Sequence, residues 1–256
     1  MFVVPGTLFL FKSALEFRGG GLKILDLAQA RALMANKGWV STLPHNLAEH
    51  FLSLTSHKHL KKGEYFQHIG DEHRIFFGVA TGALLLHVPV PPRGVICGHV
   101  SLPADWMGIG PALTKTDRQV AFEAATTTDL LTISATNFNQ LVMEHPDVTK
   151  HVVALVMINQ RTSLRTAADL LIQNPRTRLV ARLLTLSGLK LNERAERRQV
   201  NLPITQEQLA AMSSLSRATV NRILSDLETV GLCTGIYGGI GIPDLFELEA
   251  SLDEAN

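Results

Sequence analysis

The sequence predicts an α+β protein with an N-terminal antiparallel β-roll, a long central helix and a C-terminal winged helix-turn-helix. Short apolar runs separated by turn residues lie between Lys61 and Ser134, and a stretch without glycine or proline follows from Asp147 to Gln173. Two short capped helices are then predicted between Thr205 and Leu227. We therefore divide the chain into an extension (1–30), a β-roll domain (31–145), a long dimerisation helix (146–174) and a helix-turn-helix domain (175–256).

Composition is that of an ordinary globular protein. The 256 residues suffice for two domains, and 46% apolar with 18% charged residues exclude a disordered or fibrous chain. Cys97 and Cys233 have neither metal-ligand spacing nor a disulfide pattern, so we expect a reducing cytoplasm. The apolar segment Met1–Phe11 contains Pro5 and Gly6 and is too short to cross a bilayer, so no membrane partner is expected.

Charge is unevenly distributed, although the net charge is only +1. Between Arg176 and Ser225 nine basic residues stand against three acidic ones, and the charged residues that follow are all acidic. Such a local basic face is suited to phosphate, and the alternative is an ordinary solvated helix surface. The nine basic residues are Arg176, Arg178, Arg182, Lys190, Arg194, Arg197, Arg198, Arg217 and Arg222.

Six apolar runs predict the strands of an antiparallel sandwich or barrel, because they are short and are separated by glycine and proline. The segment Pro91–Gly94 predicts a hairpin loop, since neither of its two prolines can donate to a strand ladder. The predicted strands cover residues 65–69, 74–79, 83–90, 95–102, 120–125 and 130–133.

The stretch after Pro146 predicts one long helix, with Pro146 at its first position. Asn174 and Pro175 end this helix and cap the next one, which marks the domain boundary. Six positions recur at steps of three and four, as a two-stranded seam requires, so we expect pairing with a second copy. The alternative is that this helix packs on its own β domain, in which case Gln160 and Ser163 would need buried hydrogen-bond partners. The seam is Val153, Val156, Gln160, Ser163, Ala167 and Leu170.

Each of the two short C-terminal helices starts at a capping residue. Thr205 and Gln208 form a capping box, and Ser216 caps the second helix. Ala210 is small enough to let the helices cross closely, and seven apolar residues supply their contacts, as in a helix-turn-helix. These are Leu209, Met212, Leu215, Val220, Ile223, Leu224 and Leu227.

The second of these helices begins with side chains suited to DNA, and the N-terminal end of such a helix enters the major groove. We assign Arg222 and Asn221 to base edges, and Arg217 to a base or a phosphate. Ser216 and Thr219 are assigned to phosphates; the alternative is a pair of packing helices with incidental arginines. The candidate DNA-binding residues are Thr205, Ser216, Arg217, Ala218, Thr219, Asn221 and Arg222.

The segment from Gly231 to Leu248 follows this helix and predicts a strand, a turn and a strand, which would form the wing.

This order of elements resembles the Crp/Fnr superfamily from about Leu33 to Leu248. The most specific part is SRATVNRILSDLETVGL (Ser216–Leu232), which is similar to the family's recognition helix with its SRxTVxR core. FNQLVMEHPDV (Phe138–Val148) resembles the family's lead into its dimer helix, and KKGEYFQHIGDE and ADWMG resemble its β-roll more loosely. The resemblance implies a homodimeric transcription regulator on a palindromic operator, with double-stranded DNA, a second copy and RNA polymerase as partners.

The DNA-binding module departs from the family pattern at two positions. Ala218 stands where the family commonly has a glutamate that contacts cytosine, so the preferred operator should differ. Ser214 occupies the turn position that favours glycine for its positive φ, which should cost a little stability rather than function.

The effector pocket departs further. Cyclic-nucleotide binders place a glutamate on the ribose and an arginine followed by serine or threonine on the phosphate. Here Arg118 is kept, but Ile109 and Gln119 replace the other two groups, and Leu164 replaces a hydroxyl on the long helix. The resemblance thus implies a regulator that does not depend on cyclic AMP, and Arg118 has the alternative of a solvated loop arginine. The candidate pocket residues are Gly108, Ile109, Arg118, Gln119, Gln160, Ser163 and Leu164.

A different function class stays open, namely a sensor of an unknown small molecule in which DNA binding is secondary. Haem is the less favoured ligand, because Cys97 and His99 share a predicted strand on which at most one faces the interior. An N-terminal cysteine cluster for iron and sulfur is absent from the sequence. We also find no nucleophile elbow, zinc motif, P-loop or recognisable carboxylate pair, so no enzyme, metal or cofactor is expected.

Overall fold

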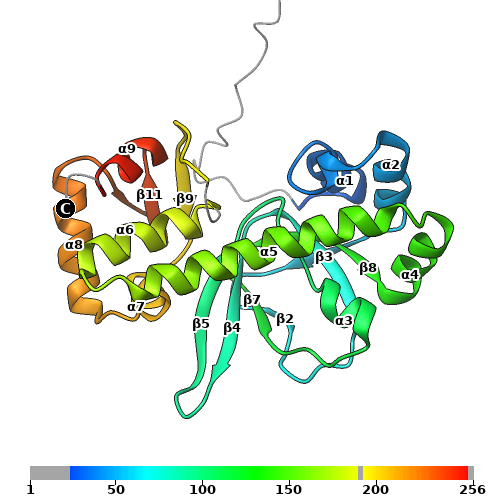
Figure 1. Cartoon of the computed structure of the whole chain (residues 1–256), viewed down its shortest axis with the longest axis horizontal. Helices are drawn as coiled ribbons and strands as arrows, with labels where there is room; N and C mark the ends of the chain where they lie inside the picture. The colour runs from blue at the N-terminus through cyan, green and yellow to red at the C-terminus, as the bar shows by residue number, and fades with distance from the viewer. Residues whose placement is uncertain (1–23, 190–192, 253–256) are drawn as a thin grey trace, which may run out of the picture.

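The computed structural model describes residues 24–189 and 193–252. Most of the predicted extension, Lys190 and the acidic residues Asp253 and Glu254 lie outside the described residues. The architecture is the predicted α+β arrangement, with a β-roll, a long helix that runs along it and a helix-turn-helix domain at the end of that helix (Figure 1). Within the described ranges, no helix combines the length and hydrophobicity that crossing a membrane requires.

Two four-stranded antiparallel sheets form the β-roll. The six predicted apolar runs correspond to β2, β3, β4, β5, β7 and β8. β1 was missed because its sequence SHKHL is mostly polar, and β6 because it has two residues. In strand order, one sheet is β1 (Ser56–Leu60), β8 (Thr128–Ser134), β3 (Ile75–Thr81), β6 (Trp106–Met107), and the other is β2 (Tyr65–Gln67), β7 (Ala121–Ala124), β4 (Leu84–Val90), β5 (Gly94–Ser101).

Helices precede and follow the strands of the roll, and one short helix, α3, lies between β6 and β7. α1 starts at Leu27, inside the predicted extension, because Asp26 and Gln29 form a capping box and Ala30 and Met34 are buried. The helix therefore begins within the segment expected to be an extension, and it packs against the roll. The flanking elements are α1 (Leu27–Ala35), η1 (Val40–Thr42), α2 (His45–Ser53), α3 (Ile109–Thr114) and α4 (Ala135–Glu144).

The long helix α5 spans Val148–Leu171, 24 residues, and so starts later than predicted. Pro146 precedes it rather than opening it, since His145 is extended (φ −129°, ψ 75°) and Asp147 is the N-cap. The predicted elbow is confirmed, because the Asn174 side chain accepts the N–H groups of Arg176 and Thr177 and Pro175 is the first residue of α6 (Pro175–Leu186).

The C-terminal domain contains the predicted pair of helices, α7 (Gln206–Ser213) and α8 (Arg217–Thr229). Its wing is shorter than predicted, since β10 (Thr234–Ile236) and β11 (Gly239–Ile242) are followed by helix α9 (Leu245–Ala250). Asp244 caps α9, and its apolar residues Leu245 and Leu248 are buried at helical spacing. β9 (Val200–Leu202) pairs with β11 and completes a three-stranded sheet.

The helix-turn-helix domain packs directly on the roll. One hydrophobic cluster joins Leu85, Cys97 and Val100 of the roll to Leu179 and Leu183 of α6. The domain is therefore fixed against β4 and β5 by burial of apolar surface as well as by the elbow.

Candidate nucleic-acid interface

Helix α8 presents a polar face to solvent and an apolar face to its own domain. Its N-terminal residues Arg217, Ala218, Asn221 and Arg222 are exposed, at the i, i+4 spacing that places pairs of them on one side. Val220, Ile223, Leu224 and Leu227 are buried. The predicted recognition residues are thus accessible together, on the first two turns of one helix.

Capping fixes the start of both helices of the motif. The Ser216 hydroxyl accepts the Thr219 N–H at 3.1 Å and lies 2.8 Å from the Thr219 hydroxyl. Thr205 accepts the Gln208 N–H at 3.1 Å and donates its own N–H to Gln208 Oε1 at 2.7 Å, which confirms the predicted capping box. The first turn of α8 is exposed and carries the positive end of the helix dipole, a combination that suits a phosphate oxygen.

The turn between α7 and α8 has the predicted left-handed residue. Ser214 has φ 52° and ψ 46°, a region in which a side chain is strained, and its N–H donates to Ala211 O at 3.3 Å. Leu215 N–H donates to Ala210 O at 3.0 Å. This turn sets the angle at which α8 leaves α7, and glycine would adopt its left-handed conformation without the strain of a side chain.

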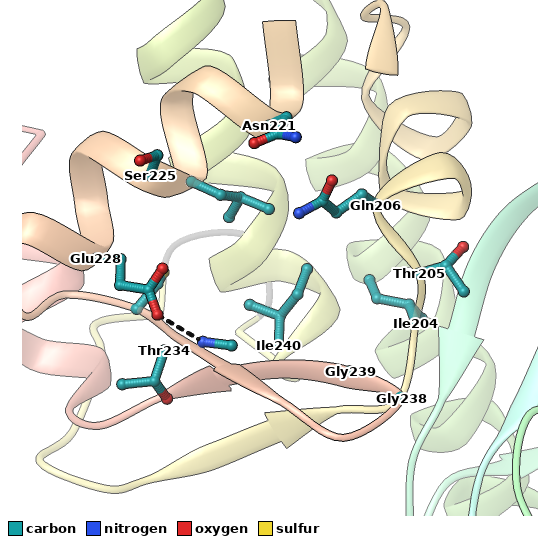
Figure 2. A pocket seen from close by; sticks show the side chains of 13 residues that line it. Ile204, Thr205, Gln206, Asn221, Ser225, Glu228, Thr234, Gly238, Gly239 and Ile240 are labelled. Atoms are coloured by element: carbon teal, nitrogen blue, oxygen red, sulfur yellow. Dashed lines mark hydrogen bonds between the residues drawn. The ribbon is translucent and has the colours of Figure 1, made fainter. Parts of the chain in front are cut away.

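A groove of about 330 Å³ lies between α8, the start of α7 and the wing. Figure 2 shows Asn221 and Gln206 reaching toward it from α8 and α7. Glu228 Oε1 accepts the Gly235 N–H at 3.1 Å and so ties the far end of α8 to β10. Sequence reasoning missed Gln206 and Ser225 as lining residues, although Ser225 follows Asn221 at the same i, i+4 spacing.

Fewer arginines of the predicted basic face are available to bind phosphate than the sequence suggests, because several are buried or bound to other groups of the protein. Arg182 is fully buried. Arg197 pairs with Asp244 at 3.0 Å and with Glu247 at 2.8 Å, and Arg198 donates to Ser187 O at 2.7 Å. Within the described ranges Arg217 and Arg222 form no ion pair and remain available to an external anion.

All six predicted seam positions of α5 are exposed in the single chain, along one stripe of the helix. A neighbouring face of α5 is buried against the roll through Val148, Val152 and Leu155. Packing of α5 on its own β domain therefore buries one face of the helix but leaves the six seam positions exposed. The exposed apolar side chains along the helix are Val153, Val156, Met157, Leu164, Leu170 and Leu171.

Arg118 of the predicted pocket is buried, only 2% exposed, and so is no solvated loop arginine. Its Nη2 donates to Ile75 O at 3.1 Å, and its guanidinium lies 5.9 Å from the ring centres of Phe77 and Phe122. Burial lowers the pKa of Arg118 to about 10, opposed by the charge of Asp71. Gly108 adjoins it, since a Cβ there would lie 3.0 Å from Arg118 Nη1.

The other predicted pocket residues are not gathered around Arg118. Ile109 begins α3 and packs into the core between the roll and the helices. Gln119 is exposed and donates to Asp117 O, while Gln160, Ser163 and Leu164 lie on the exposed stripe of α5. Phe66, Phe77 and Phe122 fill the roll beside Arg118, with successive ring centres 4.9 and 5.0 Å apart.

Cys97 and His99 both face the interior where β5 meets the helix-turn-helix domain, so the expectation that at most one of them does so is wrong. Cys97 belongs to the shared hydrophobic cluster, and burial raises its pKa to about 12. His99 pairs with Leu86 across a register shift that separates it from Cys97. Burial and the charge of Arg182 lower the pKa of His99 to about 4. Neither side chain is presented as an accessible ligand.

Comparison with known proteins agrees with this architecture. Residues 177–251 match the family model of the Crp-like helix-turn-helix domain. No curated protein sequence matches the chain significantly.

Solved structures share the fold of most of this chain at low sequence identity. A putative cyclic nucleotide binding protein from Ruegeria pomeroyi is 19% identical, with 90% of this chain and 99% of that one covered and a TM-score of 0.63. FixK2 from Bradyrhizobium japonicum is 20% identical over 77% of this chain and 96% of its own, with a TM-score of 0.63. The c-di-GMP responsive global regulator CLP from Xanthomonas campestris is 18% identical over 78% and 99%, with a TM-score of 0.57.

The β-roll, the long helix and the helix-turn-helix domain thus form the fold shared with these structures, and the domain that contains α8 matches a sequence family. The chain therefore carries a Crp-like helix-turn-helix domain at residues 177–251 and shares its overall fold with these solved structures.

Proposed function

We propose that the protein is a homodimeric transcription regulator that binds a palindromic operator through α8. The observation that carries the proposal is the exposed set of Arg217, Asn221 and Arg222 at the start of a capped helix, where neither arginine forms an ion pair with the described part of the chain. Arginine and asparagine can each bind a base edge with two hydrogen bonds, and the helix start can bind phosphate. DNA as the target places the protein in the cytoplasm, and RNA polymerase is the further partner that a regulator of this kind would contact.

The exposed stripe of α5 supports the homodimer. Six large apolar side chains on one helix are costly to leave in water, and pairing with a second α5 would cover them. A twofold axis along the paired helices would put two copies of α8 about 34 Å apart, in successive turns of the major groove. The operator would then consist of two inverted half-sites.

We propose further that cyclic AMP does not control this protein. Ile109 and Gln119 offer no carboxylate and no hydroxyl beside Arg118, and aromatic rings occupy the interior of the roll. A second candidate function, sensing of a different effector, rests on Arg118 itself. Its buried Nε has no hydrogen-bond partner among the described residues, so a polar group of a small molecule could bind there.

The DNA-binding proposal is tested by selecting bound sequences from a random duplex library, followed by affinity measurements on the selected site at several salt concentrations. We expect a palindrome with half-site centres about 10 base pairs apart, and an affinity that falls steeply as salt is raised. Failure to enrich any sequence, together with weak binding to all duplexes at low salt, would refute the proposal.

The effector proposals are tested separately by thermal shift. A ligand that binds only the folded state raises the melting temperature, so cyclic AMP should produce no shift. A shift with 2-oxoglutarate, haem or another cyclic nucleotide that is lost in Arg118→Met would identify the effector class.

A further inference from the structure

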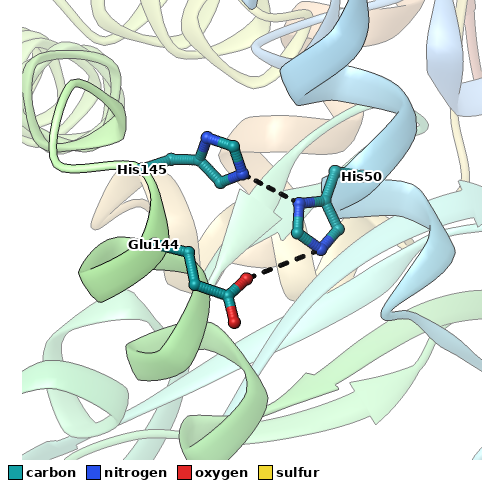
Figure 3. Close-up of side chains that lie close together, drawn as sticks. All are labelled: His50, Glu144 and His145. Atoms are coloured by element: carbon teal, nitrogen blue, oxygen red, sulfur yellow. Dashed lines mark hydrogen bonds and ion pairs between the residues drawn. The ribbon is translucent and has the colours of Figure 1, made fainter.

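Three potential metal ligands lie together on the side of the molecule away from the helix-turn-helix. His50 comes from the last turn of α2, Glu144 is the last residue of α4, and His145 follows it (Figure 3). One donor atom from each of the three residues lies within 4.8 Å of the other two. His50 Nδ1 is 3.0 Å from His145 Nε2, and His50 Nε2 is 3.9 Å from Glu144 Oε2.

The backbone and the core hold these donors in place. α2 and α4 are packed together through Phe51 and Phe138, whose ring centres are 6.4 Å apart. His145 is kept out of the helix because a proline follows it, and its N–H donates to Leu141 O at 2.8 Å. The three side chains therefore meet because of the fold around them, and little ordering is needed to bring them together.

The contacts within the cluster do not use all of the atoms that could bind a metal ion. Two imidazole nitrogens that face each other form a single hydrogen bond, in which one ring donates and the other accepts. The 3.9 Å separation between His50 Nε2 and Glu144 Oε2 is too long for a hydrogen bond. Gln140 Nε2 donates to Glu144 Oε1 at 2.8 Å, which orients the carboxylate and leaves Oε2 with only the long contact to His50 Nε2. His50 faces Glu144 with Nε2 and His145 with Nδ1, and a single ion would take one of these two nitrogens.

We infer that His50, Glu144 and His145 form a binding site for a divalent transition-metal ion, with Zn²⁺ as the expected ion. Two imidazole nitrogens and one carboxylate oxygen match the ligands of zinc, whereas Mg²⁺ and Ca²⁺ prefer oxygen alone. The 3.0 Å between the two nitrogens is close to the roughly 3.3 Å expected for ligands about 2.05 Å from a tetrahedral ion. His50 and His145 are half-buried and Glu144 is exposed, so an ion can enter and a water can fill the fourth position.

Such an ion would connect α2 to the junction between α4 and α5. α5 begins at Val148, only three residues after His145. Occupation of the site would therefore stabilise the start of the long helix and raise the melting temperature.

The experiment measures Zn²⁺ binding by the full-length protein after treatment with a chelator. Isothermal titration with Zn²⁺ should give one site per chain, whereas Mg²⁺ should give no heat. His50→Ala and His145→Ala should each weaken binding at least about tenfold, the loss seen even for outer-shell changes. Glu144→Gln keeps the side-chain shape and should weaken binding similarly, which makes it a second test should a histidine variant fold poorly.

Two control variants locate the binding. His45 lies on the same helix in an exposed pair with Glu49, 3.3 Å apart, and His45→Ala should leave Zn²⁺ binding unchanged. His57 and His59 share the Asp129 carboxylate at 2.9 and 2.8 Å, and His57→Ala tests whether that cluster binds zinc instead. Absence of Zn²⁺ binding in the wild type, or loss of binding in His57→Ala but not in His50→Ala, would overturn the assignment.

Discussion

The guanidinium of Arg182 and the carboxylate of Asp169 lie 3.7 Å apart in a buried ion pair that joins α6 to α5. Arg182 also donates to Met212 O of α7 at 3.0 Å and to Thr166 Oγ1 of α5 at 2.8 Å. Its Nη2 lies 3.4 Å from Gly98 O of β5. One side chain thus connects the long helix, the helix-turn-helix and the β-roll.

Arg182→Met should therefore reduce the free energy of unfolding by about 3 kcal/mol, because it removes the buried charge partner of Asp169 and leaves only the nearby charge of Arg165. The loss is measured by urea denaturation. Arg197→Met is the matched control, since that arginine is 64% exposed in its ion pairs and should leave the midpoint near the wild-type value. Equal midpoints for Arg182→Met and the wild type would show that the buried pair does not hold the domains together.

Stability should depend on pH through His99. Burial and the charge of Arg182 lower the pKa of His99 to about 4, so the unfolded chain binds this proton more tightly than the folded one. The stability that His99 contributes is present above pH 6.5 and is lost as the pH falls toward 4. The urea midpoint of the wild type should therefore drop more steeply over this range than that of His99→Gln. His45→Gln, at an exposed position, should follow the wild type, and parallel curves for His99→Gln and the wild type would contradict the prediction.

Val156→Glu should convert the protein to a monomer, because it places a charge in the apolar stripe of α5. Light scattering with size-exclusion chromatography should show the mass halved, and affinity for the selected operator should fall with it. Ala154→Glu, an exposed position on another side of α5, is the control and should remain dimeric. A Val156→Glu protein with unchanged mass would exclude this stripe as the dimer contact.

Arg222→Ala should weaken binding to the selected operator by about 1–3 kcal/mol and relax the base preference at one position of each half-site. Fluorescence anisotropy with wild-type and singly changed duplexes measures both effects. Arg93→Ala removes an exposed arginine in the β4–β5 turn and should bind as the wild type does. A uniform loss across all duplexes would reassign Arg222 from a base edge to a phosphate.

Ser214→Gly should raise the free energy of unfolding by about 0.5–1 kcal/mol, because glycine adopts φ 52° without the strain of a side chain. The same change at Ser225, inside α8, should lower it by about 0.5 kcal/mol, since glycine is the poorer helix former. If the turn is strained, thermal denaturation should show a higher melting temperature for Ser214→Gly and a lower one for Ser225→Gly than for the wild type.

Local signals were sufficient for much of the fold. The capping residues Asn174, Thr205 and Ser216, the left-handed Ser214 and six of the strands depend on short-range hydrogen bonds and on alternation along the chain, which the sequence shows directly. β1 was not predicted because its sequence SHKHL is mostly polar. α1 was not predicted although Asp26 and Gln29 form a capping box at its start. The prediction that the second strand of the wing extends to Leu248 was wrong, because Asp244 caps a helix instead.

By itself, the sequence determined the order of the domains and the residues that α8 presents, because caps and periodicity are properties of neighbouring residues. Only the tertiary structure decided which charged groups are buried and which form ion pairs. It buried Arg118 and Arg182 and paired Arg197, all of which look like ordinary surface arginines in the sequence. It also brought His50 to Glu144 and His145 across some 95 residues of chain. Burial and long-range charge pairing depend on which distant segments pack together, and no local pattern encodes that.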